Sequence, residues 1–394
     1  MRPGIVSPFV LTAPLSLVAA GALLTIEGSE ALRSSWDAAT LSLTHVGALG
    51  FLTLSMFGLV YEVAPAIASR RVRGPRLAYA VLALLVLGIA SLAWSLRSDA
   101  RWAVLASLSA LSPGLLLFIA PLAWSLRGER TPTVGTALLL ALAGLLLAGV
   151  LGLWMLHGHG GMQFPGPRGL WVQVHLSVAL LGWVGGLQAG LVWHLVPGAR
   201  PRRAPDRLAN LRLALLGVGI VLPVLVLGLA MVGILGAGLA STSRLAALGA
   251  LPAAISVWVL QPLQMLRSLA RSERENGAGL LLVKSSLALA PLTGLAALAA
   301  YVADGDRWGL LLGWVAIWGW AGMLAHGLLL RVAAPRPATA SGLGFGLHLA
   351  SLIAGVFAIL IGLPWIARGA GLLLVATALE LGRCHVSRLR ARPV

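Results

Sequence analysis

Long apolar stretches alternate with short polar segments along the whole chain. A helix of about 20 residues crosses the roughly 30 Å hydrocarbon layer of a bilayer. The pattern predicts about twelve such helices, at residues 5–26, 39–67, 77–96, 102–126, 135–156, 171–197, 213–236, 246–266, 279–301, 308–332, 341–363 and 369–383. The polar segments are too short for a soluble domain. We therefore expect residues 1–394 to form a single all-α transmembrane domain in contact with the lipid bilayer.

Composition and charge support a multi-pass membrane protein and suggest its orientation. Hydrophobic residues make up 59% of the chain and charged residues only 10%, whereas soluble domains carry about 25% charged residues. The net charge of +17 would suggest a nucleic-acid partner in a soluble protein. With the N-terminus in the cytoplasm, however, 22 of the 29 basic residues fall at cytoplasmic ends. This bias predicts that both termini are cytoplasmic, in the bacterial inner membrane, with no nucleic acid bound.

A glycine pattern returns at every fourth predicted helix. Gly50-Phe51, Gly182-Trp183 and Gly319-Trp320 are each followed, after six further residues, by a Gly-Leu pair and then by a proline. Repetition at a fixed period indicates related structural units. We expect three four-helix pseudo-repeats, at about 1–130, 131–267 and 268–394. The glycine face 182–190 of the sixth helix admits two interpretations, close packing of a helix or close approach of a flat cofactor.

Four histidines lie within predicted membrane helices, where an ionisable group is a functional hypothesis by default. His45 and His175 are at matching depth in the second and sixth helices, about 10–12 Å from the outer surface at 1.5 Å per residue. His326 and His348 lie in the inner half of the tenth and eleventh helices. Imidazole ligates haem iron and copper. The alternative for each is a hydrogen bond across a helix interface.

Two further histidines, His157 and His159, lie in the outer segment "HGHGGMQFPGPRG". With Met162 and His175 they could supply a copper site, because copper accepts imidazole and thioether ligands. A flexible polar turn is the alternative. His194 and His385 are expected at the cytoplasmic interface.

The segments "THVGALGFLTLSMFGLVYEVAP" (44–65) and "WVQVHLSVALLGWVGGLQAGLVWHLVP" (171–197) resemble two helices of haem-copper oxidase subunit I. The resemblance is to the cbb3-type oxidase and nitric oxide reductase branch of that superfamily. It implies a twelve-helix bundle of three four-helix arcs, with His45 ligating a haem and His175 ligating copper. No CxxCH motif for covalent c-type haem is present, and a b-type haem is expected. NnrS, a membrane protein family associated with nitric oxide stress, is a second comparison.

The chain departs from the oxidase pattern where oxygen would be reduced. Residues 213–236 contain no histidine pair, and the outer half of the tenth helix reads "WGLLLGWVAIWGW". The resemblance therefore implies a possible oxidoreductase that lacks the full ligand set, in electron transfer or in the handling of O2 or NO. An electron donor or partner subunit would be expected. Two alternatives remain, a polytopic transporter and a cofactor-free accessory subunit of a respiratory complex.

Overall fold

The computed structural model describes residues 6–68, 72, 75–98, 100–127, 132–159, 161, 166–199, 207–235, 239–271, 277–303, 305–333 and 342–390. Met162, which the sequence suggests as a copper ligand, lies outside these residues. Within them the chain is helical, and twelve helices are long and apolar enough to cross a membrane. The expectation of an all-α chain with about twelve spanning helices is therefore confirmed.

Several of the twelve spans consist of more than one helical element. In chain order the elements are α1 (Val6–Glu27), η1 (Gly28–Leu32), α2 (Ala38–His45), η2 (Val46–Thr53), α3 (Leu54–Ile67), α4 (Pro75–Ser98), α5 (Arg101–Leu126), α6 (Pro132–His159), α7 (Arg168–Ser177), η3 (Val178–Gly185), α8 (Gly186–Leu195), η4 (Pro197–Ala199), α9 (Arg207–Met231), α10 (Leu239–Ala254), η5 (Ile255–Leu260), α11 (Gln261–Ala270), α12 (Ala278–Val302), α13 (Asp306–Trp314), η6 (Val315–Ala321), α14 (Gly322–Ala333), α15 (Gly342–Ile361) and α16 (Pro364–Arg390).

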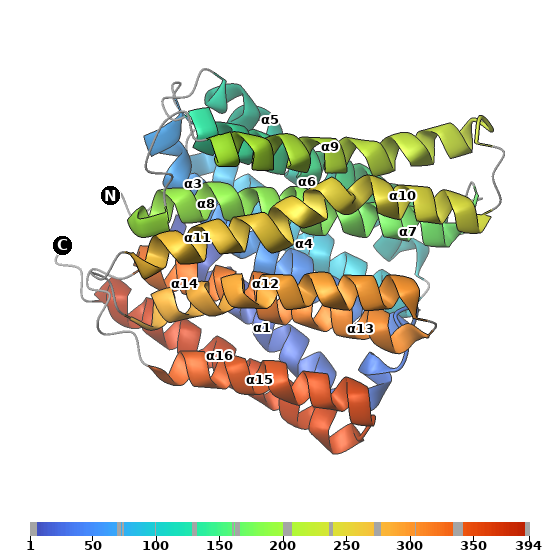
Figure 1. The fold of residues 1–394 in the computed structure, drawn as a ribbon. Helices are drawn as coiled ribbons and strands as arrows, with labels where there is room; N and C mark the ends of the chain where they lie inside the picture. Colours follow the sequence, from blue (N-terminus) through green and yellow to red (C-terminus); the bar gives the residue numbers. More distant parts are fainter. Residues whose placement is uncertain are drawn as a thin grey trace.

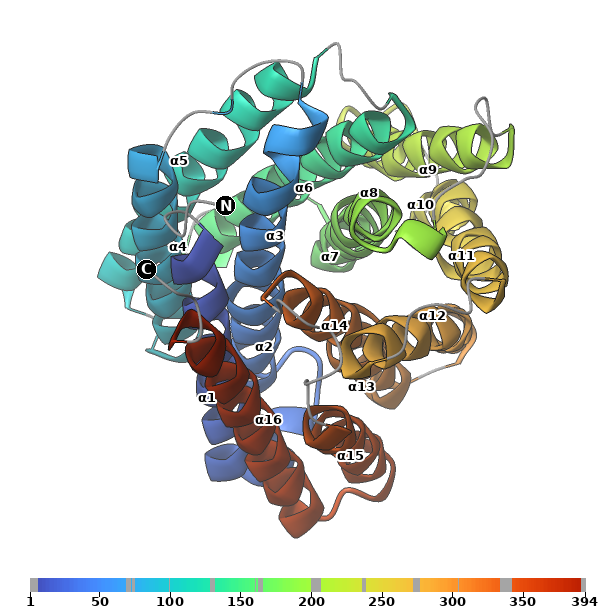
Figure 2. The ribbon, with the colours of Figure 1, turned by 90° about the vertical axis from the view of Figure 1, so that its left-hand side faces the viewer.

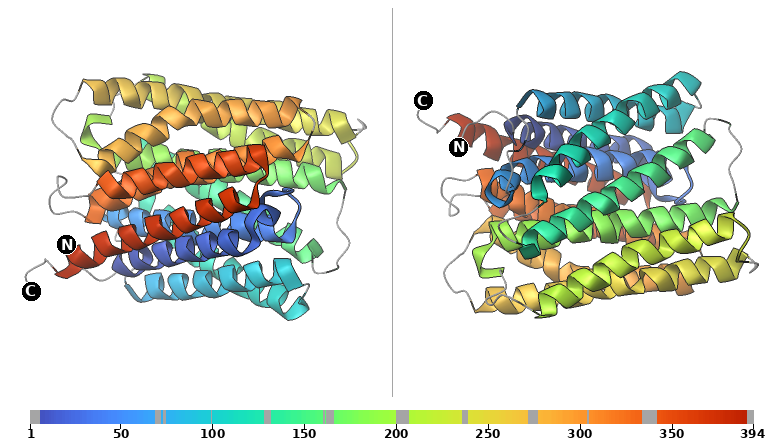
Figure 3. Two further views of the ribbon diagram at one scale, coloured as in Figure 1. Left: turned by 90° about the horizontal axis from the view of Figure 1, so that it is seen from below. Right: turned by 90° about the horizontal axis from the view of Figure 1, so that it is seen from above.

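Successive spans run in opposite directions through one bundle. α1 begins and α16 ends at the same end of it, which is called the termini end below (Figure 1). The first and last helices also pack side by side, as the left panel of Figure 3 shows. α16 extends beyond the predicted 369–383 in both directions. The extension is explained by burial, since its inward face continues from Ala367 to His385.

Three spans form the interior of the bundle, and we refer to them as the inner helices. They are the second (α2, η2 and α3), the sixth (α7, η3 and α8) and the tenth (α13, η6 and α14). In their most apolar windows 78%, 78% and 72% of the residues are buried, against at most 50% in the other described spans. α3, α8 and α14 contact one another, and Figure 2 shows them around the middle of the bundle.

Each inner helix contains a π-helical segment, a wider helix with i→i+5 bonding that often occurs at functional sites. These segments are η2, η3 and η6, and one outer span has a fourth, η5. η2 and η3 begin 132 residues apart, and η3 and η6 begin 137 residues apart. The π-helical segments of the inner helices thus recur at the same two intervals as the glycine pattern.

The outer helices present apolar side chains to the surroundings. Leu105, Val221, Leu248, Leu295 and Leu372 are all more than half exposed. Such a surface is stable in lipid, where an apolar side chain has no cost of hydration.

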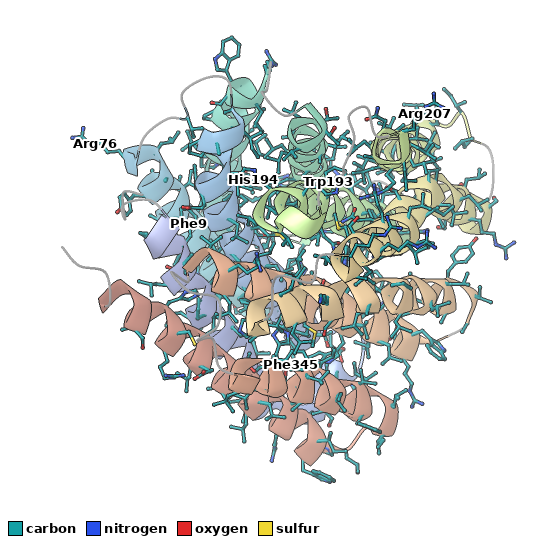
Figure 4. All side chains as sticks on the ribbon, turned by 60° about the vertical axis from the view of Figure 1, so that its left-hand side comes forward. Phe9, Arg76, Trp193, His194, Arg207 and Phe345 are labelled. Atoms are coloured by element: carbon teal, nitrogen blue, oxygen red, sulfur yellow. The ribbon has the colours of Figure 1, made fainter. Side chains whose placement is uncertain are left out.

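Polar and aromatic side chains occupy the ends of the bundle. Arg76 and Arg207 are exposed and point away from the helices, whereas Trp193 lies among them (Figure 4). Exposed tryptophans cluster at the end opposite the termini, as interfacial tryptophans do in membrane proteins; they include Trp36, Trp102, Trp154, Trp308 and Trp365.

Candidate functional site

The first histidine pair lies directly before the π-helical segments of two inner helices. His45 is the last residue of α2, and His175 comes two residues before the end of α7. Nδ1 of His45 lies 2.8 Å from the carbonyl oxygen of Leu41, one turn earlier in the same helix. A carbonyl oxygen only accepts hydrogen bonds, so Nδ1 carries the hydrogen. The lone pair of neutral His45 is therefore on Nε2.

His175 is held in the same tautomer by the neighbouring helix α6. Its Nδ1 lies 3.0 Å from the carbonyl oxygen of Ala148 and donates to it. Its ring also rests against Gly152, where an added Cβ would be 3.0 Å from the ring atom Cε1. The α6 backbone thus orients the ring, and the lone pair of His175 is likewise on Nε2.

The two rings share a region of the bundle and each has an uncommitted nitrogen. Neither Nε2 of His45 nor Nε2 of His175 bonds to the described part of the chain. Both side chains are half-buried, and they are close enough for their charges to interact. A ring N–H donated to a backbone carbonyl is the usual arrangement that orients a metal-ligating histidine. Each imidazole of the pair therefore has a lone pair on Nε2 with which it can bind a metal.

The second pair is a direct hydrogen-bonded dyad near the termini end. His326 of α14 and His348 of α15 are both 1% exposed, and their Nδ1 atoms are 3.0 Å apart. Nε2 of His348 lies 2.7 Å from the carbonyl oxygen of Trp318 and donates to it. Neutral His348 must then accept at Nδ1, so His326 donates from its own Nδ1. Both nitrogens of His348 are used in hydrogen bonds, so a ligating role stays a prediction for His326 alone, through its Nε2.

The last helix, α16, packs against α14 and carries an ion pair between Glu380 and Arg383. Glu380 is 7% exposed and receives hydrogen bonds of 2.7 and 2.8 Å from the Nε and Nη2 atoms of Arg383. A Cβ added at Gly344 would lie 3.6 Å from Cγ of Glu380 and 3.6 Å from both Cε1 and Nε2 of His326. Gly344 of α15 thus lies between the Glu380 side chain and the His326 ring.

His385 does not lie at the interface as the sequence suggests. It is 2% exposed and close enough to His326 for their charges to interact. The reason is its register on α16, because Leu374, Ala378, Leu381 and His385 recur at helical spacing and all are buried. His194, in contrast, is half-buried in the last turn of α8.

The outer histidines do not complete a copper site in the described residues. His157 and His159 are half-buried in the last turn of α6, and the ring of His157 lies 6.0 Å from that of Trp154. No group of three or more histidine, cysteine or acidic side chains with metal-binding geometry occurs in the part of the chain that is described. A copper site that also uses Met162, which lies outside the described residues, stays a prediction.

The glycine face of the sixth helix is covered by protein. Added Cβ atoms at Gly182, Gly186 and Gly190 would come within 3.2 Å of backbone or side-chain atoms of α6. Close helix packing, one of the two interpretations of this face, therefore accounts for it, and no cofactor stacks there.

Tryptophans fill the outer half of the tenth helix, where the oxidase family has histidines. Trp314 and Trp318 are buried with ring centroids 5.7 Å apart. Nε1 of Trp314 donates to the carbonyl oxygen of Leu352 over 3.0 Å, and Phe51 stacks on Trp318 at 6.4 Å.

Three glutamines within the helices make hydrogen bonds to other helices. Nε1 of Trp320 donates to Oε1 of Gln188 over 2.8 Å, and both side chains are fully buried. Nε2 of Gln173 donates to the carbonyl oxygen of Ser243 over 3.0 Å. Gln264 accepts a hydrogen bond from Arg212.

Three features of the site were not predicted from the sequence. The π-helical segments, the dyad of His326 and His348, and the burial of His385 all depend on neighbouring helices. Only the last had a usable signal, namely the helical spacing of apolar residues that leads to His385.

A comparison of the sequence with protein-family models gave no match, and no curated protein is significantly similar to it. The functional conclusion is therefore drawn from the residues and their geometry.

Proposed function

We propose that the protein is a haem-binding integral membrane protein that acts in electron transfer or in the handling of a diatomic gas such as O2 or NO. His45 and His175 are the proposed ligands, through Nε2 of each ring. The observation that carries the proposal is their shared geometry. Each donates Nδ1–H to a backbone carbonyl and leaves Nε2 unbonded, and the two rings are close enough for their charges to interact.

The surroundings of the two rings suit a flat and largely apolar group. One turn beyond each histidine, the small and aliphatic side chains of Ala48, Leu49, Ala179 and Leu180 are also half-buried. From Leu181 to Trp193 every residue of the sixth helix is buried. The partly exposed residues of the sixth helix thus lie at the level of His175 and beyond it toward Arg168, and the rest of the helix to Trp193 is buried.

In such a site, residues of the chain hold the two histidine rings and orient them toward the bound group. Leu41 and Ala148 fix the two tautomers through their carbonyl oxygens, and Gly152 leaves room for the ring of His175. A bound haem would supply one-electron exchange or an open position for a gas molecule. His175 as a copper ligand is the alternative assignment, and copper would then need further ligands from a partner.

Full oxygen reduction is not proposed. α9 carries no histidine, and the outer half of the tenth helix carries the buried Trp314 and Trp318 in place of histidines. The protein would then be an oxidoreductase component that exchanges electrons with a donor or partner subunit.

We also propose that the bundle consists of three four-helix units and that the termini end faces the cytoplasm. The first point is supported by the matching intervals of the glycine pattern and the π-helical segments, and by the burial of every fourth span. The second is supported by the basic residues at the termini end and the tryptophans at the other. This topology is that of a bacterial inner-membrane protein.

A transporter is the less favoured alternative. Transporters usually have helices broken at mid-membrane, but α5 and α9 run unbroken through Pro113 and Pro223. A cofactor-free accessory subunit would purify with a stable partner and without a visible spectrum.

The test is an absorption spectrum of protein purified from haem-replete cells. A Soret band that is lost in His45→Ala and in His175→Ala, but kept in His194→Ala, supports the proposed ligands. His194 provides the control because it lies in the same inner helix as His175 but in the last turn at the other end.

A further inference from the structure

The π-helical segment η6 accepts hydrogen bonds from side chains of two neighbouring helices. His348 of α15 donates from Nε2 to the carbonyl oxygen of Trp318 over 2.7 Å. Ser286 of α12 donates to the carbonyl oxygen of Trp320 over 2.6 Å. Both donor side chains are at most 1% exposed. Because hydrogen bonds are stronger in a low-dielectric interior, the two donors hold η6 at one rotation about its axis.

His348 joins two points of the tenth span. Besides its bond to the Trp318 carbonyl, its Nδ1 accepts from Nδ1–H of His326 over 3.0 Å. Trp318 belongs to η6 and His326 to α14. One imidazole therefore bridges the junction between the wider helix and the ordinary one, and each of its nitrogens makes one hydrogen bond.

A second contact with α15 holds the ring next to Trp318. Nε1 of Trp314, the last residue of α13, donates to the carbonyl oxygen of Leu352 over 3.0 Å. The ring of Trp314 fits beside α15 because position 355 is glycine, and a Cβ there would overlap it. The rings of Trp314 and Trp318 then pack with their centroids 5.7 Å apart. α15 thus fixes the backbone of Trp318 and also one side of its indole.

The indole of Trp318 connects this arrangement to the second inner helix. A Cβ at Gly47 would lie 2.8 Å from two of its ring carbons, and Phe51 stacks on it with centroids 6.4 Å apart. Gly47 comes two residues after His45, the proposed haem ligand. A displaced Trp318 ring would therefore disturb the backbone of η2 next to His45.

We propose that His348 is a positioning residue for the haem site, and that it acts by holding Trp318 of η6 against Gly47 of η2. The inference rests on the proposed function, because it deepens the role of His45 as a haem ligand. It also explains why a histidine occupies this buried position. Buried polar groups need partners, and this ring donates at one nitrogen and accepts at the other, which an apolar side chain cannot do.

The test compares two substitutions of His348 with a matched control. His348→Leu removes both hydrogen bonds, whereas the amide of His348→Gln can donate to the Trp318 carbonyl in place of Nε2. Ser351→Ala is the control, because Ser351 is fully buried in the same helix and its hydroxyl bonds the carbonyl oxygen of His348 within that helix. We expect a shifted or weakened Soret band in His348→Leu, recovery in His348→Gln, and the parent spectrum in Ser351→Ala.

A second measurement does not require haem. The full chain is labelled with fluorotryptophan, and the 19F NMR signal of Trp318 is assigned by its loss in Trp318→Phe. This signal should move in His348→Leu and in Gly47→Ala, and keep its position in His348→Gln and in Ser351→Ala. An unmoved signal in His348→Leu would overturn the proposal. A moved signal with an unchanged haem spectrum would overturn the positioning role.

Failure of the haem assignment would be distinguishable from failure of this inference. A haem-free parent protein would contradict the proposed function and with it the role of His348 toward haem, whereas the 19F signals would still show whether His348 holds Trp318. If His348→Leu fails to fold, solid-state NMR of the parent protein with ring-15N histidine and carbonyl-13C tryptophan measures the bond directly. A histidine N–H nitrogen close to a tryptophan carbonyl carbon is expected, and the absence of any such contact would overturn the proposal.

Discussion

The indole of Trp318 packs against Gly47, and a Cβ at Gly47 would be 2.8 Å from two of its ring carbons. This contact joins the π-helical segments of two inner helices two residues beyond His45. The indole of Trp318 has little room to move away from an added methyl, because Phe51 stacks on it and Trp314 packs beside it.

Gly47→Ala should therefore destabilise the protein. Overpacking of a dense interior typically costs about 1–3 kcal/mol, so the detergent-solubilised variant should melt at a lower temperature. Gly228→Ala in α9 is the matched control, because nothing lies within 4 Å of a Cβ there. Equal melting temperatures for the two variants would show that the inner helices are not packed as described.

The bond between Gln188 and Trp320 predicts non-additive substitutions. Gln188→Leu leaves the buried indole N–H of Trp320 without its acceptor, which should cost about 1–3 kcal/mol. Adding Trp320→Phe removes that orphaned donor, so the double variant should lose less stability than the two single variants combined. Strict additivity in thermal or denaturant unfolding would mean that the bond is absent.

The region of the first pair can be probed without removing a ligand. Gly152→Ala places a methyl 3.0 Å from Cε1 of His175 and should displace the ring by a few tenths of an ångström. We expect a shifted or weakened haem spectrum while the protein remains folded. Gly169→Ala, which meets nothing within 4 Å in the same inner helix as His175, should leave the spectrum unchanged. Identical spectra in both variants would place the haem away from His175.

The number and type of spans were predictable because a membrane helix needs about 20 apolar residues, and that length is visible in the sequence. The pairing of Glu380 with Arg383 was also predictable, since residues three apart share a helix face. Depth along a helix also predicted one level for His45 and His175, and the two rings are close enough for their charges to interact.

The remaining features depend on contacts between helices that are distant in the sequence. The direction of the His175 ring is set by Ala148 of α6, and that of His348 by Trp318 of η6. No local pattern encodes either partner. The covering of the 182–190 face by α6 is of the same kind, because a row of glycines permits close approach without specifying what approaches.

The most direct test of the haem assignment is a reduced-minus-oxidised absorption spectrum of the purified chain, combined with haem and metal analysis. The account predicts the Soret and visible difference bands of a b-type haem, absent in folded His45→Ala. A colourless, metal-free preparation from haem-replete cells, or an undiminished spectrum in both His45→Ala and His175→Ala, would contradict it.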